Sequence, residues 1–260
     1  MEWSGEKGDI KLNGNVVAED VGSPYVLYGL IADTEYVIQV VNALGESEKV
    51  TFKTKEVTYK EVTILCDFTD KVAGSVVENA NIAKIATLNT IALPDDKSFY
   101  EFSSGRYAGI KQLNDSQVFN ISNVTSGNMV QILLTYNIID ALERYDSNYF
   151  SDRGATTVVE KVAVAREEIQ KISVSTYGFG RGATGTMLTM NVFNETSWNS
   201  GVHHTEATSS LLNQSVDSNC INDDGLVDVL VRAEAADTTV ASAVAIDYAK
   251  SELTILVEED

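Results

Sequence analysis

Apolar and polar residues alternate over short stretches in the first 57 residues, as they do in half-buried β-strands. The alternation is clear at 36–43 and again at 49–55, and the turn-forming residues 44–47 separate the two stretches. A polar and charged segment follows at 55–63, between apolar stretches, which is typical of a junction between domains. The pattern therefore predicts a small β domain over residues 1–57.

From residue 62 onward, short stretches rich in β-branched and aromatic residues recur to the end of the chain. Segments rich in Gly, Asn, Asp and Ser separate them, and long helical patterns do not alternate with them. Many short strands predict an all-β fold, with a larger jelly-roll β-sandwich over residues 62–257. The stretch 155–172 mixes helix-forming residues with alternation at 158–164, and we expect a strand there with a short helix.

Charge and hydropathy narrow the classes of partner. The formal net charge is −19, from 38 acidic and 19 basic residues, which disfavours nucleic acid and predicts a solvated acidic surface. No stretch approaches the roughly 18 unbroken apolar residues that a membrane span needs. The N-terminal segment lacks the basic and apolar regions of a signal peptide. If the protein works outside a cell, we expect it to arrive without a classical signal or after the signal was removed.

Two cysteines, Cys66 and Cys220, lie far apart in the chain. Neither has the Cys or His spacing of a zinc site. Cys66 lies in an apolar, strand-like stretch, where a buried free thiol is the ordinary expectation. The sequence leaves open whether the two cysteines form a disulfide.

Residues 29–55 resemble the second half of a fibronectin type III domain. The positions that match its strand and turn patterns are Leu30, Asp33, Thr34, Tyr36, Asn42, Gly45 and Ser47. The resemblance implies an immunoglobulin-like sandwich in which Tyr36 buries its ring and its hydroxyl bonds to backbone at a sheet corner. It also implies that Trp3 takes the place of a core tryptophan. Because such a sandwich needs about 100 residues, the first strand is missing, and the domain is either open there or completed by another chain.

Four later segments occur in the order of another family pattern. They are the stretches 172–182, 186–200, 223–235 and 245–255, with Phe193, Asn194 and Trp198 in a hairpin and Asp247 and Tyr248 in the closing strand. Together with looser matches upstream, residues 95–257 resemble a jelly-roll module of the carbohydrate-binding type. Such modules recur in tailed-phage structural proteins and in microbial surface proteins. At the Trp-Asn-Tyr position of the family's hairpin, the aromatic residues are reduced in this sequence to Phe193.

A Gly-rich motif, GxGxxG, occupies Gly180–Gly185 after a predicted strand. A dinucleotide-binding loop of this pattern must open a helix whose N-terminus meets the pyrophosphate. The residues that follow, 186–193, have the composition of a strand. We therefore expect a tight hairpin turn between two strands and no nucleotide site.

Two groups of side chains are candidate binding positions. Three aromatic residues near predicted loop tips suit stacking on a sugar ring, with packing at the core or rim as the alternative. These are Tyr177, Phe179 and Trp198. Four oxygen-bearing residues near one loop suit a structural Ca²⁺, with a solvated turn as the alternative. These are Asp217, Asn219, Asp223 and Asp224.

No catalytic motif stands out, and only two histidines are present. We expect a non-enzymatic protein without a cofactor, apart from the structural Ca²⁺ considered above. The resemblances imply a virion structural protein of a tailed phage: a tail, baseplate or head-decoration subunit that contacts other virion proteins, copies of itself and a host surface glycan. The alternative is a carbohydrate-binding or adhesion module of a microbial cell-surface protein. Neither interpretation includes nucleic acid or a membrane as a partner.

Overall fold

The computed structural model describes residues 2–3 and 6–259. The chain forms two compact units, which we call unit 1 (Met1–Lys60 with Val257–Asp260) and unit 2 (Glu61–Leu256). The boundary after Lys60 lies inside the polar segment 55–63. Strands account for 46% of the chain and helices for 12%, which confirms the predicted all-β fold. Among the described residues, no helix is both long and apolar enough to cross a membrane.

Unit 1 contains a single antiparallel sheet in its described residues, with the strand order β2-β1-β3-β4 and with β5 also paired to β3. Its strands are β1 (Gly8–Leu12), β2 (Asn15–Val21), β3 (Glu35–Asn42), β4 (Gly45–Glu46) and β5 (Val50–Lys53). The predicted turn at 42–47 is present as the β3–β4 hairpin, in which Asn42 pairs with Gly45. The described residues therefore hold one sheet where an immunoglobulin-like sandwich has two.

The core of unit 1 lies on one face of this sheet, where Ile10, Ile38 and Val40 are buried. Tyr36 is also buried, and its hydroxyl accepts a hydrogen bond from the backbone N–H of Ile31 at 2.8 Å. The buried ring and the backbone bond are as expected for Tyr36, although unit 1 lacks the second sheet of an immunoglobulin-like sandwich. Residues 22–34 form no strand, and they contribute apolar side chains to that face. A loop therefore stands where the second sheet of an immunoglobulin-like sandwich was expected.

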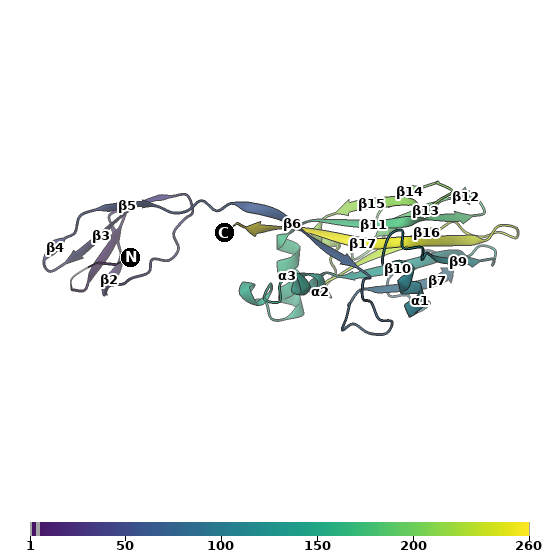
Figure 1. Cartoon of the computed structure of the whole chain (residues 1–260), viewed down its shortest axis with the longest axis horizontal. Helices are drawn as coiled ribbons and strands as arrows, with labels where there is room; N and C mark the ends of the chain where they lie inside the picture. Colours follow the sequence, from purple (N-terminus) through teal and green to yellow (C-terminus); the bar gives the residue numbers. More distant parts are fainter. Residues whose placement is uncertain (1, 4–5, 260) are drawn as a thin grey trace. The chain divides into compact units, whose positions relative to one another are not determined.

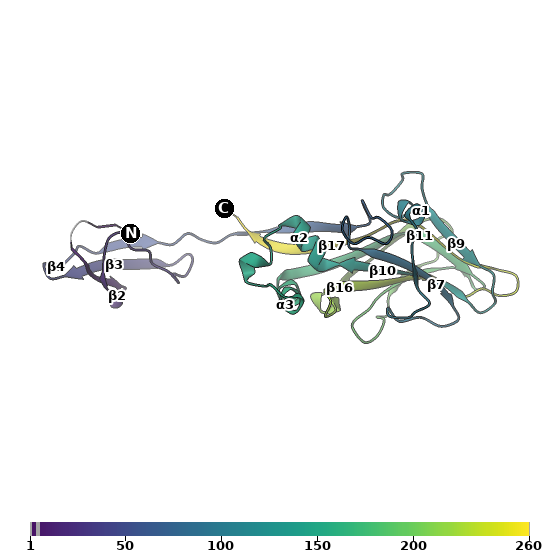
Figure 2. The same cartoon turned by 90° about the horizontal axis from the view of Figure 1, so that it is seen from below.

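Unit 2 is a two-layer β-sandwich (Figures 1 and 2). One six-stranded sheet has the order β14-β13-β16-β10-β7-β8, and the other contains β12-β11-β17-β6 with β15 on β11 and β9 on β17. The strands of the first are β7 (Ile82–Leu88), β8 (Tyr100–Glu101), β10 (Met129–Asn137), β13 (Leu188–Val192), β14 (Val202–His204) and β16 (Leu226–Ala233). Those of the second are β6 (Tyr59–Asp67), β9 (Phe119–Asn123), β11 (Ile169–Gly182), β12 (Gly185–Thr186), β15 (Ser210–Val216) and β17 (Ser242–Glu258).

The core of unit 2 lies between the two sheets. Ile132 of β10 and Val174 of β11 are both fully buried, and the Thr176 hydroxyl lies 3.5 Å from the Met190 sulfur of the opposite sheet. Both cysteines are buried and free, which confirms the expectation for Cys66. They therefore do not form a disulfide with each other. Burial raises the pKa of each thiol to about 12, so both remain protonated at neutral pH.

Three α-helices and two short 3-10 turns accompany the sheets in the described residues, and α2 and α3 lie side by side at one end of unit 2 (Figures 1 and 2). The helical segments are α1 (Ser104–Ala108), α2 (Ile138–Tyr145), η1 (Ser151–Arg153), α3 (Val158–Glu168) and η2 (Ser218–Cys220). The helix expected within 155–172 is present as α3, but it is longer than expected, and the strand predicted there begins only at residue 169. A capping box causes the difference: the Thr157 hydroxyl accepts from the Glu160 N–H, and the Glu160 carboxylate accepts from the Thr157 N–H. The backbone donors of Thr157 and Thr156 lower the pKa of Glu160 to about 2.

The GxGxxG segment is the hairpin between β11 and β12, in which Gly182 pairs with Gly185. This confirms the predicted turn. At Gly182 the chain passes so close to residues 234–235 that a Cβ would lie 2.4 Å from the carbonyl oxygen of Glu234. The glycine is thus needed for a close approach of two backbones and not for contact with a phosphate.

A buried lysine organises the loop that follows β6. Lys71 is 8% exposed, and its ammonium donates to the carbonyl oxygens of Ser75 at 2.5 Å and Asn79 at 3.0 Å. It also lies 5.7 Å from the centre of the Tyr107 ring. The loop is therefore folded around a positive charge that the chain itself supplies.

Candidate functional site

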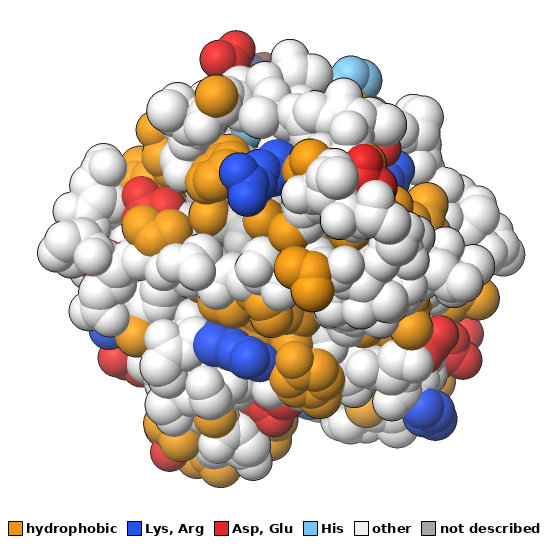
Figure 3. Space-filling model, turned by 90° about the vertical axis from the view of Figure 1, so that its right-hand side faces the viewer, with side chains coloured by type: hydrophobic (Ala, Val, Ile, Leu, Met, Phe, Trp, Pro, Cys, Tyr) orange, Lys and Arg blue, Asp and Glu red, His pale blue; other side chains and the backbone are white. Residues whose placement is uncertain are grey.

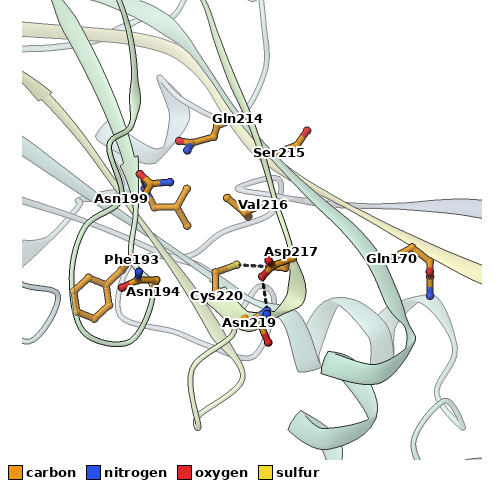
Figure 4. Close-up of a pocket in the computed structure, with 11 residues that line it drawn as sticks. Gln170, Phe193, Asn194, Asn199, Gln214, Ser215, Val216, Asp217, Asn219 and Cys220 are labelled. Carbon is orange, nitrogen blue, oxygen red and sulfur yellow. Dashed lines mark hydrogen bonds between the residues drawn. The ribbon is translucent and has the colours of Figure 1, made fainter.

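A groove opens between the two sheets of unit 2, beside β13 and β15. It has a volume of about 550 Å³ and is lined by Gln170, Val192, Phe193, Asn194, Asn199, Gln214, Ser215, Val216, Asp217, Asn219 and Cys220. In the close-up, Phe193 lies at one end and Gln170 at the other, with Asn199, Gln214 and Val216 between them (Figure 4). Carboxamides are the commonest side chains of this lining. We call it the amide groove.

Two of the carboxamides are fixed by the turn that follows β13. The Asn194 Oδ1 accepts from the backbone N–H of Ser197 at 3.0 Å. The Asn199 Oδ1 accepts from the backbone N–H of Val192 and of Gly201, both at 3.0 Å. These bonds occupy the carbonyl end of each side chain. In the described part of the chain neither Nδ2 group has an acceptor, so both remain donors that a ligand can use.

Gln214 supplies an acceptor on the opposite wall. It is paired with Val174 in the β15–β11 register, so its side chain points toward the space between the sheets. Its Oε1 is buried and has no hydrogen-bond partner among the described residues. A buried carbonyl oxygen without a partner is unfavourable, and a ligand hydroxyl would satisfy it if the side chain turns toward the groove.

Asp217 is the sole carboxylate of the described lining. Its Oδ1 accepts from the backbone N–H of Asn219 at 2.9 Å, which caps η2. Its backbone oxygen lies 3.1 Å from the Cys220 sulfur (Figure 4). The second carboxylate oxygen has no protein donor among the described residues, and Asp217 is exposed.

Phe193 gives the groove its aromatic wall, and Trp198 holds Phe193 in place. The two rings meet edge to face, with centroids 5.0 Å apart and an interplanar angle of 64°. Trp198 is anchored in turn, because its Nε1–H donates to the carbonyl oxygen of Ala92 at 2.8 Å. The Ala92 N–H donates to Gln131, which is fully buried in β10. A fixed chain of contacts thus runs from β10 to the groove.

A second hollow, of about 620 Å³, also includes Phe193 in its lining, together with five carboxylates. These are Asp95, Glu195, Asp223, Asp224 and Asp228. We call it the acidic hollow. Arg166 neutralises part of it by pairing with Glu195 and Asp223. Burial raises the pKa of Asp228, although a hydrogen bond from Thr135 at 2.6 Å lowers it in part.

The four residues considered for Ca²⁺ are not gathered into one set. Asp217 and Asn219 line the amide groove, whereas Asp223 and Asp224 line the acidic hollow. The described residues contain no group of three or more His, Cys, Asp or Glu side chains placed to hold a metal ion. The reason is local: η2 and the turn after it use these residues as caps and ion-pair partners.

The three aromatic candidates are also separated. Tyr177 and Phe179 lie within β11, on the face away from Thr176 and the core, with Tyr177 beside Leu211 and Tyr248 of the neighbouring strands. None of the ring pairs in the described chain joins Trp198 to Tyr177 or Phe179. At the end of unit 2 that carries β12 and β9, several hydrophobic side chains are exposed and charged side chains are few (Figure 3).

The most informative groove residues that sequence reasoning did not select are Asn199 and Gln214. Gln214 had no clear signal, because the sequence of strand 210–216 does not alternate and only the structure shows that this residue points inward. Asn199 had none, since its place depends on the turn after β13. Phe193 appeared in the family resemblance, but it was not selected as a binding residue.

No protein-family model and no curated protein matches the sequence. Among the solved structures that the chain matches is one with the description "Structural basis for the promiscuous specificity of the carbohydrate-binding modules from the beta-sandwich super family". The match has 6% sequence identity and a TM-score of 0.25, and it covers 87% of this chain and 73% of that chain. A likeness at this level concerns the β-sandwich fold alone.

Proposed function

We propose that the protein is a non-catalytic β-sandwich protein that binds carbohydrate in the amide groove. The observation that carries the proposal is the lining itself: carboxamides on two walls, one aromatic ring at the end and a single carboxylate among the described residues. Sugar hydroxyls both donate and accept hydrogen bonds. The Nδ2 donors of Asn194 and Asn199 and the Oε1 acceptor of Gln214 are complementary to them.

The apolar part of the groove suits the other property of a sugar ring, which is a face of C–H groups. Phe193 can stack on such a face, and Trp198 prevents the ring from turning away. Support for a binding role without catalysis comes from the titratable groups of the described lining. They are one exposed carboxylate, Asp217, and one buried thiol, Cys220, whose pKa is raised to about 12. An acid–base pair or an activated nucleophile would require more.

Binding to a panel of neutral and acidic polysaccharides tests this function. We expect wild-type protein to bind at least one neutral glycan, and Phe193→Ala to weaken that binding about tenfold, because one ring-stacking contact is lost. Affinity electrophoresis followed by calorimetry measures both. Tyr100→Ala is the matched control, since Tyr100 is 54% exposed and lies outside the groove. The proposal is contradicted if the panel gives no binding, or if Phe193→Ala binds as tightly as wild type.

We also propose a second role, as a structural subunit of a tailed-phage virion that joins copies of itself, and a feature of unit 1 supports the self-association that this role requires. An apolar hollow of about 520 Å³ opens on the core face of its sheet, lined by Glu2, Val26, Leu27, Leu30, Ile38, Val50 and Phe52. Val50 is 58% exposed, and its strand β5 pairs only with β3 among the described residues. A free strand edge beside an apolar face is a surface that another chain can extend.

Self-association measures this second role. We expect light scattering to show concentration-dependent association up to about 100 μM, and Val50→Glu to abolish it, because a charge would enter the apolar hollow. Leu44→Glu is the control: Leu44 is 85% exposed in the β3–β4 turn and does not line the hollow. A wild-type chain that stays monomeric over this range, or a Leu44→Glu chain that is equally impaired, would count against the role.

A further inference from the structure

We infer that the amide groove selects uncharged or positively charged glycans and rejects anionic ones, and that Asp217 is the residue that determines this selectivity. The inference rests on the proposed carbohydrate-binding function and adds the charge class of the ligand. Its basis is the distribution of charge in and around the groove.

The lining offers no cation to an anionic ligand. The residues that form the groove include no Lys, Arg or His in the described structure. A carboxylated, sulfated or phosphorylated sugar that entered would lose part of its hydration and gain no ion pair, which is unfavourable. It would also lie near the Asp217 carboxylate, whose second oxygen has no protein donor among the described residues.

The Arg166 guanidinium already makes hydrogen bonds and ion pairs within the protein. Arg166 donates to the carbonyl oxygen of Ile221 at 3.0 Å through Nε, and its Nη2 pairs with Glu195 and with Asp223 at 3.3 Å. These contacts fix the guanidinium on the side of the acidic hollow. Turning it toward a ligand in the groove would break an ion pair and leave a buried carbonyl without its donor.

Negative charges near the groove also disfavour an anionic ligand. The acidic hollow shares Phe193 with the groove, and Asp95 and Asp224 add negative charge there without an ion pair among the described residues. The whole chain carries a formal charge of −19. A unit charge about 4 Å from another in water changes a binding constant by about fivefold at low salt, and salt weakens the effect of more distant charges.

The test uses one neutral glycan and its charged counterpart. The probe is the neutral polysaccharide that binds most tightly in the panel, compared with the same polysaccharide after selective oxidation of its primary hydroxyls to carboxylates. We expect wild-type protein to bind the neutral form at least about tenfold more tightly in low salt. Asp217→Asn is expected to reduce this ratio about fivefold by improving binding of the oxidised form. The ratio of the two affinities, and not either affinity alone, is the quantity that reports the charge effect.

The variant is chosen to preserve the fold. An asparagine at 217 keeps an oxygen that can accept from the Asn219 N–H, so η2 remains capped. Asp115→Asn is the control, because Asp115 makes the same kind of bond, to the Gln117 N–H at 2.9 Å, and does not line the groove. It should leave the ratio unchanged.

The outcomes separate the two proposals. Equal binding of neutral and oxidised glycan by wild type overturns the charge selectivity and leaves the carbohydrate function standing. An unchanged ratio in Asp217→Asn overturns the role of this residue. Absence of binding to both forms overturns the carbohydrate function, and the selectivity with it.

Discussion

Gly182→Ala is expected to lower the free energy of unfolding of unit 2 by about 3 kcal/mol. The added Cβ would lie 2.4 Å from the Glu234 carbonyl oxygen, 2.6 Å from its carbonyl carbon and 2.7 Å from the Ala235 carbonyl oxygen. All three are backbone atoms, so no side-chain rotation relieves the clash. The strand end must separate from residues 234–235, which would also weaken the hydrogen bond from the Ala183 N–H to the Ala235 carbonyl at 2.8 Å.

Urea denaturation of the intact chain measures this loss as a lower midpoint with an unchanged slope. Gly105→Ala is the matched control: a Cβ at Gly105 would have no neighbouring atom within 4 Å, and the residue is in helix α1, where alanine is favourable. We expect it to be neutral or slightly stabilising. A Gly182→Ala chain as stable as wild type would show that the close approach is not a constraint.

Trp198→Ala is expected to cost about 2–3 kcal/mol in stability and to weaken glycan binding about tenfold. The substitution removes the hydrogen bond to Ala92 and the edge contact with Phe193. Phe193 would then be free to leave the end of the groove. Trp198 is a positioning residue here, because it acts on the ligand through Phe193.

Tryptophan fluorescence separates the two effects, because the chain contains only two tryptophans. In a Trp3→Phe background, Trp198 is the single reporter, and a neutral glycan in the groove should shift its emission. Trp198→Phe should cost only about 1 kcal/mol, since it keeps most of the ring contact and loses one hydrogen bond. If Trp198→Ala folds normally and binds glycan like wild type, Phe193 does not depend on it.

Local sequence patterns were sufficient to predict features that depend only on residues close together in the chain. The GxGxxG hairpin followed from the strand-like residues after it, because a phosphate loop would need a helix there. The hydrogen bond of Tyr36 was implied by the resemblance of its segment to a fibronectin type III domain, and its hydroxyl accepts from the Ile31 N–H. Both features are complete within a short stretch of chain, so long-range packing does not decide them.

The N-terminus of helix α3 carries a helix signal in the sequence, but a competing strand signal was given more weight. Residues 157–160 form the Thr-x-x-Glu signature of a capping box, yet the alternation at 158–164 favoured a strand. In the structure only Val162 and Ala165 of this helix are buried. Because its apolar face is narrow, hydrophobic periodicity is weak there, and the cap is the better guide.

The amide groove could not be assembled from the sequence, because its walls come from segments that only the sandwich brings together. Gln214 belongs to one sheet and Asn199 to the turn after a strand of the other. The acidic residues after 216 had the composition of a cation site, but caps and the Arg166 ion pair direct them to two different hollows. Composition identified polar loops, and the packing of the two sheets, which brings β13 and β15 together, decided which of them meet.

The lysine inside the loop after β6 has a consequence for the conditions in which the protein keeps its shape. Lys71 is tethered to the carbonyl oxygens that it serves, so its effective concentration at this place does not depend on the surrounding medium. A loop held by a dissociable ion loses its shape when that ion is diluted or chelated. This loop keeps its cation through changes of salinity and of divalent-ion supply, because the cation is a side chain of the same loop.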